Sequence, residues 1–379
     1  MNPRCLVLFE ESCTSVATKR TYRKEMDNFL KWASKDYESV LLLPDDQLHM
    51  LLEDYMLYMK RRFKKTAIQL KLAAVNKFFF VNDRVINTKK LKMFMPEATK
   101  KGGDRPITTD EIKKLLENTS LKRTKALIHV FAATGARPEA LADLRIRNVS
   151  DEPNGCKSLL LYEDSLHEYY TFLHPEAVKA LDEYWDERRD KGELLKPESF
   201  VFRKNWFIVN EKKPIGLSIQ NIETIIKETM ENAKIDRNKS GNRYDLAVCY
   251  GFRKRFNTIV KSSTEISFVT GEVLMDHTVK LESNYFKPTK DHLFEAYQKV
   301  IPELVISKEE KQRMEIQKQK EELSELKKLK QEIENLKEEK EQQRIKKKKE
   351  VDILQGGFGT KEKLLDYLKE ELKKEFSKN

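Results

Sequence analysis

Residues 249–288 read CYGFRKRFNTIVKSSTEISFVTGEVLMDHTVKLESNYFKP and concentrate the most distinctive polar residues of the chain. A Tyr-Gly-Phe-Arg segment ends in Arg253, and His277 follows after a spacer. Eight residues beyond His277, Tyr285 stands between an asparagine and a basic segment that ends in a proline. Upstream, Arg137 follows a Thr-Gly pair, which predicts a turn before a new helix. The pattern indicates two arginines, a histidine and a tyrosine that act at one site.

These residue types suit the displacement of an oxygen at a phosphodiester. The reaction builds negative charge on the non-bridging oxygens, which Arg137 and Arg253 would stabilise through permanently charged hydrogen bonds. His277 can add a further donor or move a proton. A phenol is a weak nucleophile at its usual pKa of about 10, and a cationic pocket favours the phenolate of Tyr285. The scheme needs no metal ion and no other cofactor.

Taken singly, each of these residues also has a structural explanation. Arg137 could form a surface salt bridge with Glu139 or Asp143, and a lone histidine could be a hydrogen-bonded core or loop residue. Tyr285 has a rival nucleophile in Tyr297, twelve residues on. Tyr297 lies in an amphipathic helical pattern, however, which predicts packing instead of chemistry. The assignment therefore depends on the residues occurring together.

Four segments in order carry a resemblance to a known family: TGARPEALADL (134–144), YGFR (250–253), LMDH (274–277) and NYFKP (284–288). They resemble the four catalytic boxes of the tyrosine recombinase (phage integrase) family. The segment after the tyrosine, KPTKDHLFEAYQKVIPELVI, resembles the archaeal integrase branch in particular. Each box alone is a weak signal, whereas four in order with suitable gaps are a strong one. The resemblance covers roughly residues 15–305 and leaves the last quarter of the chain unexplained.

The resemblance implies a site-specific recombinase or integrase of a virus or plasmid. Such an enzyme cleaves and rejoins DNA through a 3′-phosphotyrosyl link, here to Tyr285, and conserves bond energy without ATP. The partner implied is double-stranded DNA with inverted half-sites, bound by two protomers per site and four per synapse. Two other functions stay open. One is a type IB topoisomerase-like enzyme, and the other is a DNA-binding scaffold that has lost catalysis.

Two positions depart from the family pattern. Tyr250 stands where the family usually has a histidine, and a phenol is a poor base at neutral pH. The family also places a lysine in the β-hairpin after the first arginine, where it protonates the departing 5′ oxygen. The corresponding hairpin here has no lysine at its turn. The candidates for this general acid are His167, near the turn, and Lys157, at the start of the first strand.

Composition and charge limit the class of partner. Lys and Arg outnumber Asp and Glu by 73 to 62, for a net charge of +11. This excess favours nucleic acid over membrane, because no amphipathic anchor or lipidation motif accompanies it. The four cysteines show neither paired nor zinc-finger spacing, which predicts reduced thiols. With no signal-peptide core and no 18-residue apolar run, the sequence predicts a cytoplasmic protein.

The expected fold is mainly α, with one small antiparallel β-sheet. Helical spacing predicts a DNA-binding bundle over residues 1–95, and a Gly- and Lys-rich segment predicts a linker over 96–106. The catalytic domain is expected over 107–305, with three short strands within 145–174. A basic run in the bundle is either a solvated face or a phosphate contact, and the resemblance favours the contact. The run comprises Lys60, Arg61, Arg62, Lys64 and Lys65.

The end of the chain changes character. Residues 306–352 are almost all charged or amide residues and predict a long helix. A leucine-rich stripe of about two heptads runs along it and is short for a coiled coil, so weak self-association is the expectation. Its members are Leu323, Leu326, Leu329, Ile333 and Leu336. A Gly-rich segment at 355–359 is expected to break this helix before a last amphipathic helix within 353–379.

Overall fold

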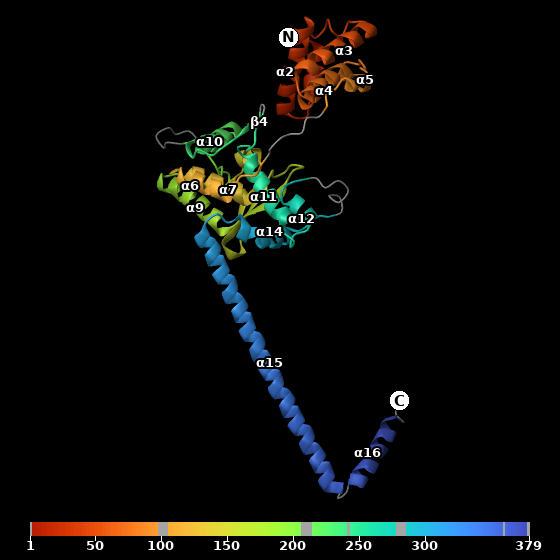
Figure 1. Ribbon diagram of the computed structural model, residues 1–379, viewed down its shortest axis with the longest axis vertical. Coiled ribbons are helices and arrows are strands. Elements are labelled where there is room, and N and C mark those ends of the chain that lie inside the picture. Colours follow the sequence, from red (N-terminus) through yellow and green to blue (C-terminus); the bar gives the residue numbers. More distant parts are fainter. Residues whose placement is uncertain are drawn as a thin grey trace. The chain divides into compact units, whose positions relative to one another are not determined.

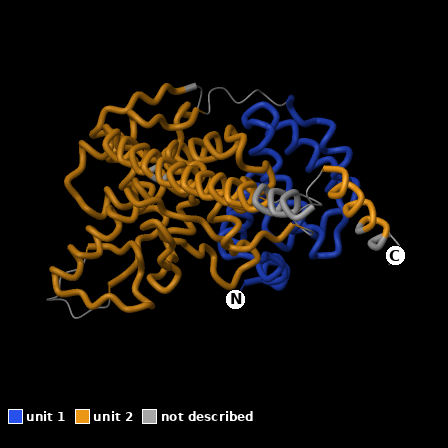
Figure 2. The backbone as a smooth tube through the Cα atoms, turned by 90° about the horizontal axis from the view of Figure 1, so that it is seen from below, with its two compact units in different colours: residues 1–102 blue, residues 103–379 orange. Residues whose placement is uncertain are grey.

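The computed structural model describes residues 2–97, 105–205, 214–240, 243–277, 286–358 and 361–376. The chain divides into two compact units, residues 1–102 and residues 103–379 (Figure 2). Tyr285 and most of the expected linker lie outside the described residues. Among the described helices, none has the length and apolar content that crossing a membrane requires.

Unit 1 is a helical bundle around its own apolar core. Its helices are α1 (Arg4–Glu11), α2 (Val16–Ala33), α3 (Asp45–Arg62), α4 (Lys65–Val81) and α5 (Thr88–Met93). The side chain of Ser15 caps α2 by accepting from the Thr18 amide at 3.1 Å. Aromatic side chains such as Phe29 and Phe78 are fully buried between the helices. These buried side chains form one apolar cluster within unit 1.

Unit 2 packs its helices around the buried helix α7. The order along the chain is α6 (Thr109–Glu117), α7 (Lys122–Thr134), α8 (Pro138–Asp143), α9 (Pro175–Asp190), α10 (Ile219–Asn232), α11 (Tyr250–Ser262), α12 (Phe268–Val273) and α14 (Lys290–Leu304). All of them except α8 are labelled in Figure 1. Helix α7 is buried from Ala126 to Thr134 and contacts α9 and α11. A capping box between Thr108 and Glu111 begins α6, as the sequence predicts.

A small sheet completes unit 2. Strands β1 (Val149–Glu152), β2 (Cys156–Leu161) and β3 (Tyr169–Leu173) pair antiparallel in the order β1-β2-β3. The first strand begins later than the sequence pattern suggests, because residues 146–148 form a 3-10 turn and the amides of residues 146 and 147 bond to residues 199 and 197. The predicted fold class, mainly α with one small antiparallel sheet, is confirmed. A two-residue pair, β4 (Lys239–Ser240) with β5 (Arg243–Tyr244), adds a minor hairpin.

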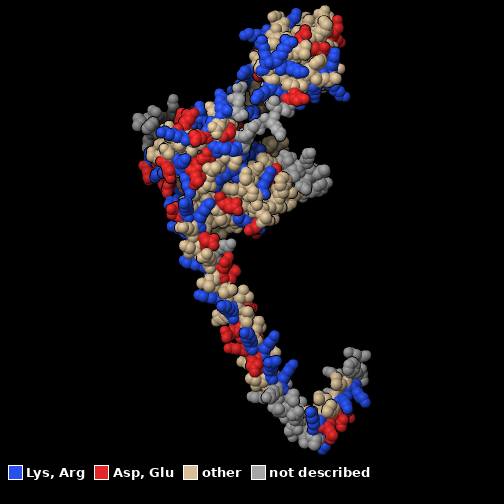
Figure 3. All heavy atoms as spheres, in the orientation of Figure 1, with Lys and Arg blue, Asp and Glu red and all other residues tan. Residues whose placement is uncertain are grey.

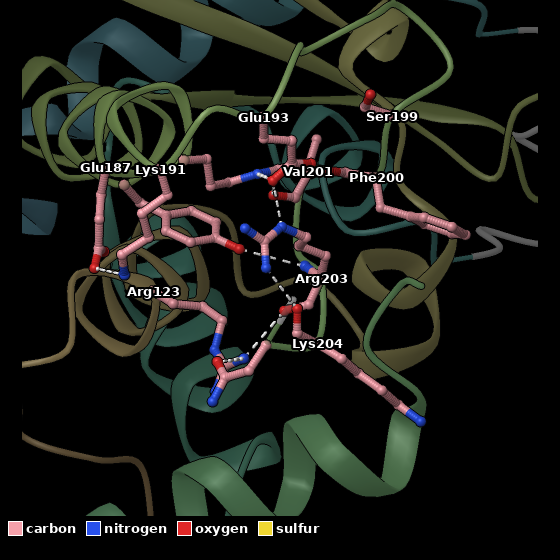
Figure 4. A network of polar contacts seen from close by, with 12 residues as sticks. Arg123, Glu187, Lys191, Glu193, Ser199, Phe200, Val201, Arg203 and Lys204 are labelled. Carbon is pink, nitrogen blue, oxygen red and sulfur yellow. Dashed lines mark hydrogen bonds and ion pairs between the residues drawn. The ribbon is translucent and has the colours of Figure 1, made fainter. Parts of the chain in front are cut away.

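A buried ionic cluster fixes the segment after α9 (Figure 4). The Glu193 carboxylate accepts from Arg188 at 2.7 and 3.1 Å and also pairs with Arg203. Arg188 in turn donates to the carbonyls of Phe200 and Val201 at 2.8 and 2.9 Å. All three charged side chains are almost completely buried. Together they attach residues 193–203 to α9.

The C-terminal region consists of α15 (Lys308–Phe358) and α16 (Lys361–Phe376) (Figure 1). The expected break at 355–359 is partly wrong, since α15 continues through Gly356 and Gly357. Each glycine costs only about 1 kcal/mol relative to alanine inside a helix, and extending an existing helix is easier than starting one. Helix α15 begins at a fixed point, because the Glu176 carboxylate accepts from the amides of Ile306 and Ser307 at 2.7 and 2.9 Å.

Candidate active site

The turn between α7 and α8 places Arg137. Gly135 ends α7 in the left-handed region with φ of 59°, and a Cβ there would lie 2.8 Å from Phe256 Cβ. Only glycine therefore suits this position. Pro138 opens α8 directly afterwards, which makes Arg137 the N-cap residue of that helix. The Thr-Gly turn places Arg137 at a helix start, as the sequence predicts.

Arg253 lies in the first turn of α11 and is buried. Its guanidinium donates to the Gly135 carbonyl at 2.9 Å and to the Met275 carbonyl. Arg253 thus joins the turn that holds Arg137 to the segment that precedes His277. Burial lowers the pKa of Arg253, and the nearby Arg137 charge adds to this effect. Two guanidiniums held close together form a site that favours an anion between them.

Asp276 is the main site residue that the sequence reasoning missed. Its carboxylate Oδ2 lies 2.6 Å from Arg137 Nη1, and its carbonyl accepts from Arg137 Nη2 at 3.2 Å. Burial opposes the charge of Arg137, but the hydrogen bond and charge of Asp276 raise the pKa of Arg137 above its usual value. The partner of Arg137 is therefore Asp276, and neither Glu139 nor Asp143. The signal was an acidic residue directly before the histidine of LMDH.

His277 is held by a carboxylate on its Nδ1 side. Nδ1 lies 3.1 Å from Glu272 Oε2, and Glu272 also pairs with Lys261. Burial lowers the pKa of His277, as does the charge of Arg253, while Glu272 opposes them. A neutral ring that donates from Nδ1 to Glu272 keeps Nε2 as a hydrogen-bond acceptor. His277 can therefore take up a proton at Nε2.

The β2–β3 hairpin brings one of the two general-acid candidates to the cluster. His167 Nδ1 lies 3.4 Å from Asp276 Oδ2, and the His167 side chain is 70% exposed. Lys157 lies at the other end of β2, where its amine is 2.6 Å from Asp151 and 3.9 Å from Asp182. Four residues of extended strand separate Lys157 from the end of β2 at Leu161, which is about 13 Å. The structure brings His167, and not Lys157, beside Arg137 and Asp276.

Tyr250 and Tyr169 lie near Arg253, whereas Tyr297 lies in the core. Tyr250 begins α11 and is 46% exposed, one turn before Arg253 on the same helix. Tyr169, at the start of β3, lies beside Arg253, and burial raises its pKa to about 12. Tyr297 is fully buried and donates to the Ala133 carbonyl at 3.1 Å, so it belongs to the core as its pattern predicts. The predicted nucleophile, Tyr285, falls outside the described residues.

The basic run of unit 1 lies where α3 ends and α4 begins. Lys60, Arg61 and Arg62 occupy the last turn of α3, and Lys64 and Lys65 begin α4. The Arg62 guanidinium stacks 4.5 Å from the centre of the Tyr58 ring. Lys60, Arg61 and Lys64 are exposed, and Lys65 is half-buried. Figure 3 shows Lys and Arg side chains prominent on the visible face of unit 1. No carboxylate within the described part of the chain forms an ion pair with these five side chains.

Comparison with known proteins gives a result at the level of fold. No protein-family model matches the sequence, and no curated protein matches it. The chain is similar to the Tn1549 transposon integrase in complex with transposon right-end DNA, at 11% identity and a TM-score of 0.51, over 78% of this chain and 98% of that one. It is also similar to a lambda integrase dimer bound to a core site, at 13% identity and a TM-score of 0.48, over 76% and 95% of the two chains. The likeness to the Tn1549 structure, together with the helical architecture and the small sheet, shows that this chain has the tyrosine recombinase fold.

Proposed function

We propose that this protein is a site-specific DNA recombinase that cleaves and rejoins strands through a 3′-phosphotyrosyl intermediate on Tyr285. The observation that carries the proposal is the convergence of Arg137, Arg253 and His277, which come from three separate segments. The hydrogen bonds of Arg253 to the Gly135 and Met275 carbonyls hold these segments together. The order of the four boxes further supports recombination over relaxation, and the segment after Tyr285 supports an archaeal element as the source.

In this proposal the two guanidiniums bind the scissile phosphate. Charge grows on its non-bridging oxygens as the Tyr285 oxygen attacks phosphorus, and Arg137 and Arg253 neutralise that charge. Asp276 occupies Arg137 in the free protein, so the phosphate takes its place on that guanidinium. Neutral His277 accepts the phenol proton at Nε2, with Glu272 stabilising the imidazolium that forms. Tyr250, exposed at the start of α11, is available to donate a hydrogen bond to the phosphate.

His167 is the general acid in this scheme. Breaking the bond from phosphorus to the 5′ oxygen leaves an alkoxide that requires a proton, and a protonated imidazole supplies one. Asp276 Oδ2 lies 3.4 Å from His167 Nδ1, which places His167 beside Arg137. Religation reverses both transfers: His167 takes the proton of the attacking 5′ hydroxyl, and His277 returns one to Tyr285. Protons and charge balance over the cycle.

The substrate in this proposal is double-stranded DNA with inverted half-sites. Two protomers occupy one site and four form a synapse, and the five cations of unit 1 supply phosphate contacts. A protein that acts in this way on a viral or plasmid element works in the cytoplasm, where the DNA lies. The similar Tn1549 integrase is in complex with transposon right-end DNA, which is consistent with this class of substrate.

The test is whether the protein forms a covalent adduct with a nicked suicide DNA substrate. The substrate carries the end sequences of the viral or plasmid element that encodes the protein. Cleavage loses the short strand, so religation cannot occur and the protein stays attached. We expect a denaturant-stable adduct with the natural chain and none with Tyr285→Phe, because only the attacking oxygen is removed. Tyr297→Phe is the matched control and should retain the adduct.

The outcomes separate the alternatives. An adduct that persists in Tyr285→Phe would overturn the nucleophile assignment. No adduct with the natural chain, together with tight DNA binding, would identify a scaffold without catalysis. An adduct accompanied by relaxation of supercoiled DNA, with no strand exchange between two sites, would identify a topoisomerase-like enzyme.

A further inference from the structure

The middle of α15 carries an apolar seam that no described part of the chain covers. Leu326, Leu329, Ile333 and Leu336 are spaced by three, four and three residues, which is the a and d spacing of a heptad repeat. Each of these side chains is between 50% and 56% exposed. Four large apolar side chains in a row on one helix face would remain in water in an isolated chain.

The charges beside this seam follow a strict rule. With Leu326 and Ile333 at a, every g position from 325 to 339 is glutamate and every e position from 330 to 344 is a cation. The g residues are Glu325, Glu332 and Glu339, and the e residues are Lys330, Lys337 and Arg344. Figure 3 shows both signs of charge along the coloured part of α15.

This arrangement specifies the partner and its direction. In a parallel pair of helices, each g residue faces the e residue of the next heptad on the other chain. Glu325 would then face Lys330, and Glu332 would face Lys337, on both sides of the seam. An antiparallel pair of the same helix would place g against g and e against e, so that like charges oppose each other. The charges therefore select a second copy of this chain in parallel orientation.

The seam residues also select two strands. A β-branched residue at a with leucine at d favours dimers, and here Ile333 stands at a between Leu329 and Leu336 at d. Beyond Leu336 the next a and d residues are Lys340 and Gln343, which end the apolar seam. A polar residue at a fixes register and oligomeric state at some cost in stability. We infer that residues 325–344 of α15 form a short, in-register, parallel two-stranded coiled coil with a second copy of the protein.

The start of α15 would transmit this pairing to the catalytic unit. Glu176, at the start of α9, binds the amides of Ile306 and Ser307, and Met314 packs against a core of unit 2. A parallel coil has its two-fold axis along its length. Two copies on inverted half-sites are also related by a two-fold axis. The match between the two-fold axis of the coil and that of the DNA site rests on the proposed function, whereas the pairing of the helices does not.

The seam spans only two heptads, so pairing in free solution should be weak. Two copies that occupy one DNA site have a high local concentration, which strengthens weak pairing without new contacts. The test must therefore detect a weak dimer, and oxidative cross-linking of the full chain does so.

The first experiment places a cysteine in the seam. Leu336→Cys lies at d, and two such thiols meet only in a parallel, in-register pair. Gln331→Cys lies at f on the outer face and is the matched control. The four natural cysteines, of which three are buried, give the baseline in the unchanged chain. We expect a disulfide-linked dimer of Leu336→Cys well above both controls. Equal cross-linking of Leu336→Cys and Gln331→Cys would overturn the proposal.

The second experiment exchanges the charges. E325K/E332K/E339K makes both flanks cationic, and K330E/K337E/R344E makes both acidic. Each charge variant is combined with Leu336→Cys. We expect either one alone to lose the disulfide cross-link, because like charges then face each other. An equimolar mixture of the two should recover the cross-link as a heterodimer, because glutamates of one chain then face cations of the other. Recovery in the mixture would also exclude misfolding as the cause of the loss. Unchanged cross-linking in the single variants would overturn the inference, whatever the covalent adduct assay gives.

Discussion

Asp276 links the residues of the candidate site without belonging to any of the roles that the boxes imply. It neutralises Arg137 at 2.6 Å and lies 3.4 Å from His167. One carboxylate thus contacts a group that would bind phosphate and a group that would give up a proton. In the proposed scheme, His167 takes the task that a hairpin lysine has in the tyrosine recombinase family.

The role of His167 can be isolated by changing the leaving group. His167→Ala should slow cleavage of ordinary DNA by about 100-fold or more, the range for loss of a general acid. With sulfur in place of the bridging 5′ oxygen, the leaving group needs no proton, so the variant should cleave at nearly the rate of the natural chain. Single-turnover cleavage of both substrates measures this. Lys157→Ala is the control and should cleave both substrates at the normal rate. If His167→Ala slowed cleavage of the two substrates equally, His167 would not be the proton donor.

The pH dependence of cleavage should report on His277. Burial and the charge of Arg253 lower its pKa below the ordinary value of about 6.5. The ring accepts a proton only when neutral, so activity should fall on the acid side at a pH below about 6.5. Glu272 opposes the shift, so Glu272→Gln should move this limb to still lower pH. Single-turnover rates from about pH 5 to 8 provide the measurement, and a limb above about 6.5 would contradict the assignment.

At the scale of elements, the ionic cluster after α9 explains how a segment without regular structure stays in place. Residues 193–205 lack a helix or strand, yet their carbonyls accept from Arg188 and Arg123 (Figure 4). Burial opposes ionisation of Glu193, but Arg188 and Arg203 outweigh burial and lower its pKa. The cluster stabilises the fold above the ordinary carboxyl pKa, and this stabilisation is lost as the pH falls through the lowered value.

Removing the central carboxylate should therefore be costly. Glu193→Gln leaves two buried guanidiniums without an anion, and the loss of one partner from a buried pair costs about 3–5 kcal/mol. Urea denaturation at neutral pH measures this as a decrease in the free energy of unfolding. The control is Asp186→Asn, which breaks the exposed pair with Arg189 and should cost about 0–1 kcal/mol. Similar decreases in the free energy of unfolding of the two variants would mean that the ionic cluster contributes little to the stability of the fold.

At the scale of the whole molecule, charge is distributed unevenly. The first 100 residues hold 19 Lys and Arg against 12 Asp and Glu. In α15, by contrast, acidic and basic side chains are mixed along the helix. DNA affinity that arises from phosphate contacts depends steeply on salt, because binding releases counterions. Unit 1 is therefore expected to provide much of the salt-sensitive affinity.

This expectation can be tested in the full chain. Replacing Lys60, Arg61, Arg62, Lys64 and Lys65 with glutamine should weaken DNA binding and flatten the plot of log affinity against log salt by up to about 4 units of slope. Fluorescence anisotropy from 50 to 300 mM salt, roughly the range where such slopes are measurable, records it. The matched control neutralises five lysines of α15, namely Lys308, Lys311, Lys320, Lys327 and Lys328. Equal changes in slope in both variants would contradict a special role for unit 1.

The sequence by itself determined most of the elements and the residue types of the proposed site. Helical spacing, the Thr108 capping box and the Thr-Gly turn before Arg137 are local features, and local backbone preferences and caps express them directly. The heptad pattern of charges in α15 can also be found from the sequence, because it repeats at a fixed period along one helix.

Only the tertiary structure decided which side chains meet. The choice of His167 over Lys157 depends on which end of β2 faces Asp276, and the pairing of Arg137 depends on a residue far along the chain. The ionic cluster around Glu193 likewise unites segments whose charges look like ordinary surface residues in the sequence. Contacts of this kind arise when helices and strands pack, and packing is set by the summed burial of many apolar side chains. No local pattern contains that information.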